Sequence, residues 1–145
     1  MQVHEIMTAE AVCFRESDPV MAIARRMREQ NIGFVPICDE RGRPVGTVTD
    51  RDIAIRVAAE DKKASRTVAR EIMAHESVTC RASDEVERAE SIMAEHHKSR
   101  IMVVDDDGRL VGVLSLADLV TGAADLRALE TFRRIAEREA RGALH

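Results

Sequence analysis

The chain is built from short blocks in which the apolar positions follow two different periodicities. In some blocks the apolar residues are three or four positions apart, as in Val20, Ile23 and Met27, which is the spacing of one face of a helix. In others, four or five apolar residues follow one another, which is typical of a buried strand. A turn containing Asp and Gly follows each such run and leads into another strand-like segment, which predicts a β-hairpin. The expected helices lie at 20–27 and 86–93, and the expected strands at 34–38, 44–48, 101–104 and 110–114.

The same order of blocks occurs twice, 66 positions apart. Without gaps, residues 3–54 match residues 69–120 at 17 of 52 positions, whereas chance gives about three or four matches at ordinary composition. Each copy predicts the order β-α-β-β-α, beginning with a short extended segment. The sequence therefore divides into repeat 1 (3–60), a linker (61–68), repeat 2 (69–122) and a tail (123–145), in which Leu126, Leu129, Phe132 and Ala136 predict an amphipathic helix.

Acidic residues mark the expected starts of the first helix of each copy. In the first copy Asp18 is expected to cap the helix, with Pro19 as its first residue. In the second copy Asp84 stands in the same place, and Glu87 follows three positions later, which is the spacing of a capping box.

The amino-acid composition of the chain argues against several classes of function. The chain has 145 residues, 45% apolar and 33% charged, which indicates a globular protein with a real core. The net charge of −4 argues against a general nucleic-acid binder. The chain has three Phe and no Tyr or Trp, so it has few aromatic side chains that could stack on bases. No run of about 18 apolar residues and no signal peptide is visible, so no membrane partner is expected. Three cysteines without metal-type spacing fit a reducing, cytoplasmic setting.

Two short motifs are the best candidates for chemistry. Thr49-x-x-Asp52 and Ser115-x-x-Asp118 occupy equivalent positions at predicted helix starts. The ordinary explanation is capping, in which the hydroxyl accepts a backbone N–H and the carboxylate complements the helix dipole. A helix N-terminus is also a natural anion site. Both roles are compatible with these residues.

Taken together, the motifs resemble a tandem pair of CBS domains, the unit called a Bateman module. The resemblance covers residues 3 to about 122, and the block 48–53 is similar to small stand-alone bacterial members. It rests on Ile-Met at the start of each copy, the Asp-x-x-Gly-x-x-Val-Gly hairpin and the Gly-x-x-Thr/Ser-x-x-Asp helix start. These stand at 6–7 and 72–73, at 39–46 and 105–112, and at 46–52 and 112–118.

The resemblance implies an α+β fold in which two pseudo-twofold-related repeats pack through their sheets, followed by a C-terminal helix. It also implies an adenosine-containing ligand between the repeats. Asp52 and Asp118 would accept hydrogen bonds from ribose hydroxyls, and Thr49 and Ser115 would face ribose or phosphate. Basic residues are expected to reach ligand phosphates, and aliphatic residues to hold the adenine. The basic candidates are Arg51, Lys98 and Arg100, and the aliphatic slot candidates are Val12, Cys13, Val35, Pro36, Ile101 and Met102.

The two copies differ in basic residues. Arg51 accompanies Asp52, and Arg100 from the other copy is expected to complete that site, which suits a phosphorylated ligand. The second copy has Ala117 in place of Arg51, so its site is expected to bind a less charged ligand or none. For each basic residue alone, a solvated surface position is the competing interpretation.

The leading hypothesis is a cytoplasmic sensor that binds AMP, ADP, ATP or S-adenosylmethionine as a regulatory ligand, without a required cofactor, and acts as a homodimer on an unidentified protein partner. The alternative is a dimeric interaction scaffold whose ligand sites are empty. An enzyme is not expected, since the chain has no nucleophile elbow, P-loop or His-Glu-x-x-His motif. A metal is not expected either, because Asp105–Asp107 lacks calcium-loop spacing and suits a hairpin turn.

Overall fold

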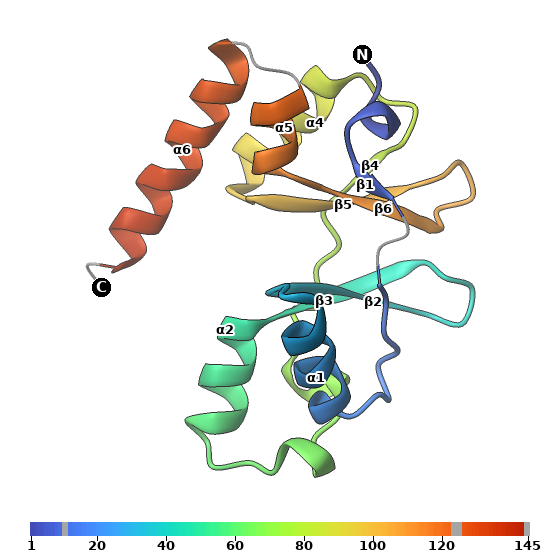
Figure 1. Ribbon diagram of the computed structural model, residues 1–145, viewed down its shortest axis with the longest axis vertical. Helices are drawn as coiled ribbons and strands as arrows, with labels where there is room; N and C mark the ends of the chain where they lie inside the picture. Colours follow the sequence, from blue (N-terminus) through green and yellow to red (C-terminus); the bar gives the residue numbers. More distant parts are fainter. Residues whose placement is uncertain (10–11, 123–125, 144–145) are drawn as a thin grey trace. The chain divides into compact units, whose positions relative to one another are not determined.

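The computed structural model has mixed α and β structure arranged in two compact units (Figure 1). It describes residues 1–9, 12–122 and 126–143, and in the last of these segments the side chains of 130–140. Unit 1 comprises residues 1–10 and 78–145, and unit 2 comprises residues 11–77. The expected α+β class is confirmed. Among the described residues, no helix is both long enough and apolar enough to cross a bilayer.

Unit 2 is a two-stranded hairpin with helices packed on it. Strands β2 (Phe34–Cys38) and β3 (Pro44–Thr49) pair antiparallel, with Phe34 opposite Thr49. The remaining elements are α1 (Val20–Gln30), α2 (Asp50–Ile53), the π-helical η2 (Ala54–Ala58), the 3-10 helix η3 (Ala64–Arg66) and α3 (Ala69–Ile72). The extended segment before α1 touches β2 through one isolated parallel bridge, between Phe14 and Ile37.

Unit 1 has a four-stranded sheet in the order β1-β6-β5-β4. Strands β4 and β5 are parallel, while β5–β6 and β1–β6 are antiparallel. The strands are β1 (Thr8–Ala9), β4 (Thr79–Arg81), β5 (Arg100–Val104) and β6 (Leu110–Ser115). The helices are the 3-10 helix η1 (Val3–Glu5), α4 (Val86–His96), α5 (Leu116–Gly122) and α6 (Leu126–Ala143).

The predicted helices and hairpins occur in both units, but the predicted caps of α1 and α4 are wrong. The N-cap residues are Pro19 and Glu85, one position later than expected. The Asp18 carboxylate instead accepts the Arg15 amide N–H at 2.8 Å, and the Asp84 carboxylate accepts that of Arg81 at 2.9 Å. Each Asp therefore closes the turn before the helix, and neither α1 nor α4 has a side-chain hydrogen bond at its N-cap.

The first N–H of α1 and that of α4 are each bonded by a carbonyl that lies two residues before the other repeat begins. Val20 N–H donates to the Thr67 carbonyl at 2.8 Å, and Val86 N–H donates to the Met1 carbonyl at 2.9 Å. Both donors and both acceptors are related by the 66-residue offset. The segment at the start of repeat 1 thus folds into the unit that holds most of repeat 2, and the reverse holds for residues 67–77. The division into repeats at 3–60 and 69–122, with linker 61–68 and tail 123–145, concerns the sequence and stays a prediction.

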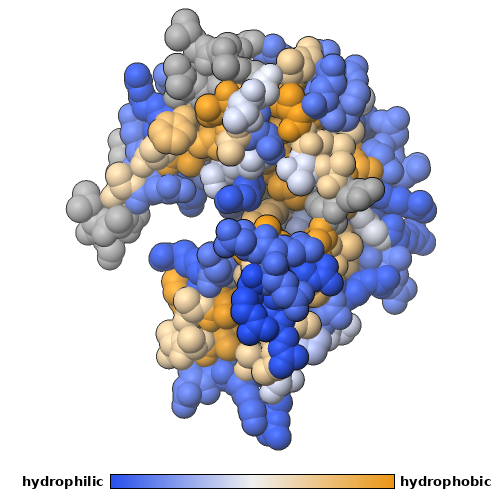
Figure 2. Space-filling model, in the orientation of Figure 1, coloured by the Kyte–Doolittle hydropathy of each residue, from blue (hydrophilic) through white to orange (hydrophobic). Residues whose placement is uncertain are grey.

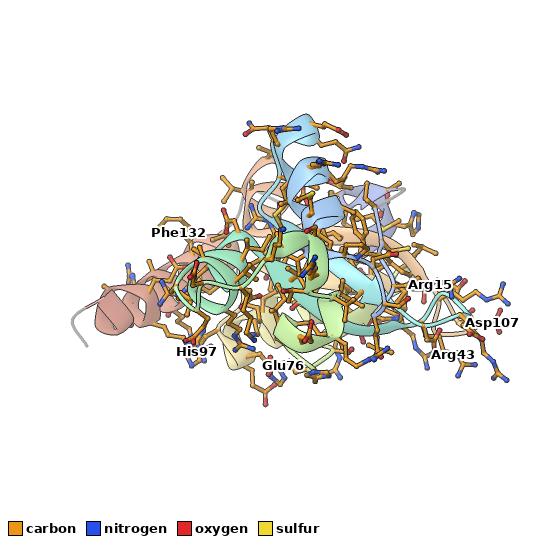
Figure 3. All side chains as sticks on the ribbon, turned by 90° about the horizontal axis from the view of Figure 1, so that it is seen from below. Arg15, Arg43, Glu76, His97, Asp107 and Phe132 are labelled. Atoms are coloured by element: carbon orange, nitrogen blue, oxygen red, sulfur yellow. The ribbon has the colours of Figure 1, made fainter. Side chains whose placement is uncertain are left out.

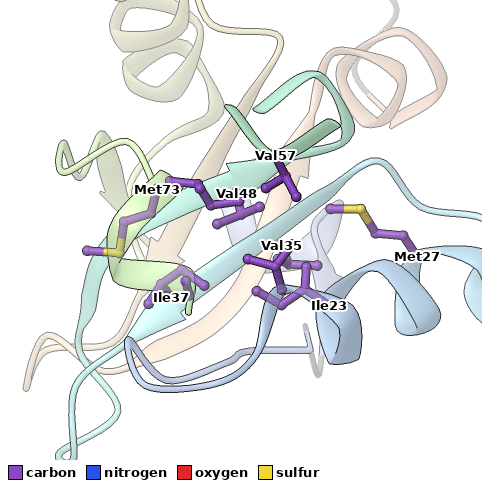
Figure 4. Packing of buried hydrophobic residues seen from close by; sticks show 10 residues of the cluster. Ile23, Met27, Val35, Ile37, Val48, Val57 and Met73 are labelled. Atoms are coloured by element: carbon purple, nitrogen blue, oxygen red, sulfur yellow. The ribbon is translucent and has the colours of Figure 1, made fainter. Parts of the chain in front are cut away.

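This exchange extends into the hydrophobic cores. In unit 2, side chains from α1, β2, β3 and η2 meet Met73, which follows α3 (Figure 4). In unit 1, Val3 of η1 is fully buried among residues of α4, β5 and β6. The visible surface is mostly hydrophilic, with apolar residues in smaller groups (Figure 2). Neither core is complete without residues from both repeats.

Two glycines allow the exchanged segments to approach the hairpins. Gly46 in β3 lies under the Ala74 carbonyl, and a Cβ atom there would overlap that oxygen. The equivalent Gly112 in β6 would place a Cβ 2.7 Å from the Met7 sulfur and 2.8 Å from the Thr8 carbonyl oxygen. The Val-Gly pairs that mark the repeats are therefore explained by close packing of backbone on backbone.

We expect Gly46→Ala to lower the free energy of unfolding by about 2 kcal/mol, because the added methyl group must displace the backbone at Ala74. Urea denaturation followed by circular dichroism measures the change. Ser65→Ala, at an exposed position in η3, is the control and should change stability by less than about 0.5 kcal/mol. Equal stabilities of Gly46→Ala and wild type would contradict the proposed packing.

Candidate functional site

The two predicted motifs form the same capping box in each unit. Thr49 ends β3, and its N–H donates to Asp52 Oδ2 at 2.9 Å while Asp52 N–H donates to Thr49 Oγ1 at 3.1 Å. The corresponding bonds of Ser115 and Asp118 measure 2.8 and 3.1 Å. All four residues are partly buried. The capping interpretation is confirmed for both motifs.

Capping leaves part of each motif available to a ligand. Each carboxylate uses Oδ2 for the backbone N–H, and among the described residues no hydrogen bond reaches Oδ1. The second lone pair and the proton of the Thr or Ser hydroxyl are likewise not needed for the cap. A ribose hydroxyl could therefore donate to Oδ1 while the helix remains capped.

The helix start in unit 2 carries a further carboxylate that the sequence analysis overlooked. Asp50 N–H donates to the Gly33 carbonyl at 3.1 Å, and the Asp50 side chain accepts Arg51 N–H at 2.8 Å. The helix start in unit 2 thus contains two carboxylates, Asp50 and Asp52, and one basic residue, the exposed Arg51. Asp50 directly follows the Thr of the motif, so its position in the sequence was a sufficient signal.

The helix start in unit 1 has a different charge balance. Arg100, the first residue of β5, lies directly opposite Ser115 in the antiparallel register. The first turn of α5 contains Asp118, with Leu116 and Ala117 in place of Asp50 and Arg51. Unit 1 therefore has one carboxylate and an exposed arginine near its motif, whereas unit 2 has two carboxylates and one arginine. Lys98 lies two residues before Arg100, where its backbone N–H caps α4 by donating to Met93 at 2.9 Å.

The predicted adenine-slot residues have different environments. Val35 and Ile101 belong to the cores of their own units. Pro36 and Met102 are their immediate neighbours on β2 and β5, so alternation places these buried residues on the opposite faces of the hairpins. In unit 2 the segment with Val12 and Cys13 runs beside β2, where Phe14 N–H donates to the Pro36 carbonyl at 3.0 Å. Within each unit the structure thus brings slot candidates and the capping motif onto one hairpin, while their role in ligand binding stays a prediction.

A carboxylate in each hairpin turn accepts backbone N–H groups of its own turn. Asp105 Oδ1 accepts the backbone N–H groups of Asp107 and Arg109, both at 2.9 Å. In the other turn, the backbone N–H of Arg43 holds the pKa of Asp39 below its usual value. Arg43 and Asp107 lie at the outer ends of their hairpins (Figure 3). Across the ranges that the structure describes, there is no group of three or more His, Cys, Asp or Glu residues suited to a metal ion.

The tail forms the predicted helix and packs on α4 in unit 1. Thr131 and Ile135 are buried, and Arg138 donates to the His97 carbonyl at 3.1 Å, beyond the end of α4. Phe132 is 52% exposed, and Figure 3 shows it on α6. Of the four residues that predicted this helix, the side chains of Leu126 and Leu129 lie outside the described residues.

Comparison with known proteins matches this architecture. The family model described as CBS domain matches residues 3–59 and again 69–125. The chain belongs to the CBS-domain family. The resemblance noted from the two motif sets is therefore confirmed, and the two compact units correspond to a tandem CBS pair.

Several known proteins are similar to this chain over most of its length. An uncharacterized protein of Methanopyrus kandleri is 31% identical over 83% of this chain, which spans 61% of that relative. Hypoxic response protein 1 of Mycobacterium tuberculosis is 33% identical, covering 79% of this chain and 80% of that protein. Among solved structures, the CBS domain pair of protein MJ0100 in complex with 5-methylthioadenosine and S-adenosylmethionine has a TM-score of 0.73 and 28% identity, over 86% of this chain and 98% of that one.

The capping boxes predict a defined effect on stability. We expect Thr49→Ala and Ser115→Ala each to lower the free energy of unfolding by about 1 kcal/mol, because each removes the acceptor for an N–H group in the first helical turn. Thr121→Ala is the matched control, since its hydroxyl bonds only to carbonyls within α5, such as that of Ala117. Urea denaturation should show little change for Thr121→Ala. A similar loss in all three variants would contradict a specific capping role.

Proposed function

We propose that this CBS-domain protein is a regulatory sensor that binds an adenosine-containing ligand at its Thr/Ser-x-x-Asp motifs. The ligand class comprises AMP, ADP, ATP and S-adenosylmethionine. The observation that carries the proposal is the pair of capping boxes, in which each Asp accepts the N–H of its Thr or Ser with Oδ2 and keeps Oδ1 available. The complex of the MJ0100 domain pair with adenosine compounds supports the same ligand class. The proposed role is binding, without turnover of the ligand.

The charge balance bears on which site takes which ligand. In unit 2, Asp50 offsets part of the attraction that Arg51 offers a phosphate, so this site needs further cations for a nucleotide. Arg100 is the candidate to supply one, as the sequence analysis expected. Its register opposite Ser115 also supports a role at the Asp118 site. We therefore propose Arg100 as the phosphate-binding residue and leave its site to experiment.

A thermal-shift panel with the four ligands tests the function. A ligand that binds only the folded protein at a hundredfold excess over Kd adds about 2.7 kcal/mol to its stability. We expect at least one ligand to raise the Tm of wild type. Asp52→Asn or Asp118→Asn should reduce that rise, because an amide keeps an acceptor for the cap but loses the anionic oxygen for ribose.

The exposed Asp107 gives a matched control for that experiment, since Asp107→Asn makes the same chemical change in a hairpin turn. It should leave the ligand-induced shift intact. If none of the four ligands shifts the Tm and calorimetry detects no binding, the alternative of a scaffold with empty sites is favoured.

The role of Arg100 is decided in two single-site backgrounds. The Asp118→Asn variant keeps only the Asp52 site intact, and Asp52→Asn keeps only the Asp118 site intact. If Arg100 serves the Asp52 site, Arg100→Gln should weaken ATP binding about tenfold in the Asp118→Asn variant and have little effect in the Asp52→Asn variant. If it serves the Asp118 site, the pattern should be reversed. Isothermal titration calorimetry with ATP measures both, and equal affinities with and without Arg100 in both backgrounds would remove it from the proposal.

We further propose that the protein acts as a homodimer that engages a protein partner. The family resemblance supports this assembly, and the exposed Phe132 on α6 offers an apolar contact outside the core. Light scattering of the intact chain measures its mass directly.

A further inference from the structure

The three cysteines occupy different environments. Cys13 is exposed in the segment before α1, whereas Cys38 at the end of β2 and Cys80 in β4 are buried. Burial and, to a smaller extent, the adjacent Cys13 raise the pKa of the Cys38 thiol to about 12, and burial also raises the pKa of Cys80 to about 12. Both buried thiols are therefore protonated at neutral pH, and the exposed thiol is the one that meets a soluble oxidant.

Two of these cysteines are neighbours in unit 2. The parallel bridge between Phe14 and Ile37 aligns their strands, and Cys38 N–H donates to the Phe14 carbonyl at 2.8 Å. Cys13 directly precedes that bridge and Cys38 directly follows it, one on each segment, and Cys13 lies near enough to the Cys38 thiol to raise its pKa. Cys80 belongs to the other unit, in the core of its sheet.

The second repeat has no cysteines at the positions equivalent to Cys13 and Cys38. The positions equivalent to Cys13 and Cys38 are Thr79 and Val104. There, β4 forms a regular parallel strand with three paired residues along β5. In unit 2 the equivalent segment is held to β2 by a single bridge. The two cysteines thus lie in the unit whose segment makes fewer backbone pairs with the neighbouring strand.

From this juxtaposition we propose that Cys13 and Cys38 form a peroxide-sensitive thiol pair, in which oxidation creates a reversible disulfide between the segment before α1 and β2. This inference does not depend on the proposed adenosine ligand.

The chemistry requires one molecule of hydrogen peroxide. The Cys13 sulfur attacks a peroxide oxygen, so an S–O bond forms, the O–O bond breaks and the departing hydroxide takes a proton to become water. The Cys38 sulfur then attacks the Cys13 sulfenic acid, so the S–S bond forms, the S–O bond breaks and the second hydroxide leaves as water with the Cys38 proton. Two thiols lose two electrons and two hydrogens, and the peroxide is reduced to two waters.

Peptide mapping tests the pairing directly, because trypsin separates the three cysteines. Cys13, Cys38 and Cys80 lie in the tryptic peptides 1–15, 29–41 and 71–81. After treatment of the folded protein with hydrogen peroxide and blocking of free thiols, we expect peptides 1–15 and 29–41 to be linked and peptide 71–81 to remain free. Dithiothreitol should release the linked pair.

Repeat-matched substitutions provide the controls. Cys13→Thr and Cys38→Val introduce the residues of the second repeat, and each should abolish the linked peptide, whereas Cys80→Ser should retain it. Oxidised wild type should also unfold at a higher temperature than reduced wild type, because the link closes a loop between residues 25 positions apart. That rise should disappear in Cys13→Thr, whose fold the same melting curve monitors.

Two results would overturn the proposal. One is oxidation of Cys13 to sulfinic acid in the folded protein without any link to Cys38. The other is a mixture of all three cysteine pairings, as the urea-unfolded chain is expected to give, because it would show that the fold does not select this pair.

Discussion

The rest of this structure depends on the backbone hydrogen bonds that the segment leading into one repeat makes to the start of α1 or α4 in the other repeat. The N–H groups of Val20 and Val86 would otherwise be unpaired at their helix starts, and the carbonyls of Thr67 and Met1 satisfy them. The same segments then supply Met73 and Val3 to the cores. A single repeat therefore has neither all its helix-start partners nor a complete core, which gives a physical reason for the tandem arrangement.

The need to pair backbone N–H groups at a helix start also shapes the candidate ligand sites. A helix that begins at the end of a strand needs an acceptor for its first N–H groups, and the Thr49–Asp52 and Ser115–Asp118 boxes supply it. Because a carboxylate has two oxygens, the structural role leaves one of them for another donor. A stability role and a binding role are thus compatible in the same residue, and only a substitution that preserves the acceptor, such as Asp→Asn, can separate them.

Duplication has left the two units similar in backbone and different in chemistry. The hydrogen bonds of the caps, turns and exchanged segments recur at the 66-residue offset with nearly equal lengths. Side chains that do not take part in those bonds have diverged. Unit 2 has Asp50 and Arg51 where unit 1 has Leu116 and Ala117. It also has Cys13 and Cys38 where unit 1 has Thr79 and Val104. Any difference in binding or reactivity between the two units must therefore arise from such side chains, because the backbone structure is similar in both.

The sequence by itself determined the duplicated α+β plan, the hairpins, the Thr/Ser-x-x-Asp helix starts and the family, because these follow from short-range periodicity, turn chemistry and a fixed repeat offset. It did not predict that Asp18 closes a turn and leaves the helix start to Pro19, since the competing acceptor sites differ by one residue. The tertiary structure alone decided why Gly46 is a glycine, which segments are exchanged between repeats and that Cys13 lies beside the strand that ends in Cys38. Each of these depends on backbone contacts between residues far apart in the chain, and no local pattern records such contacts.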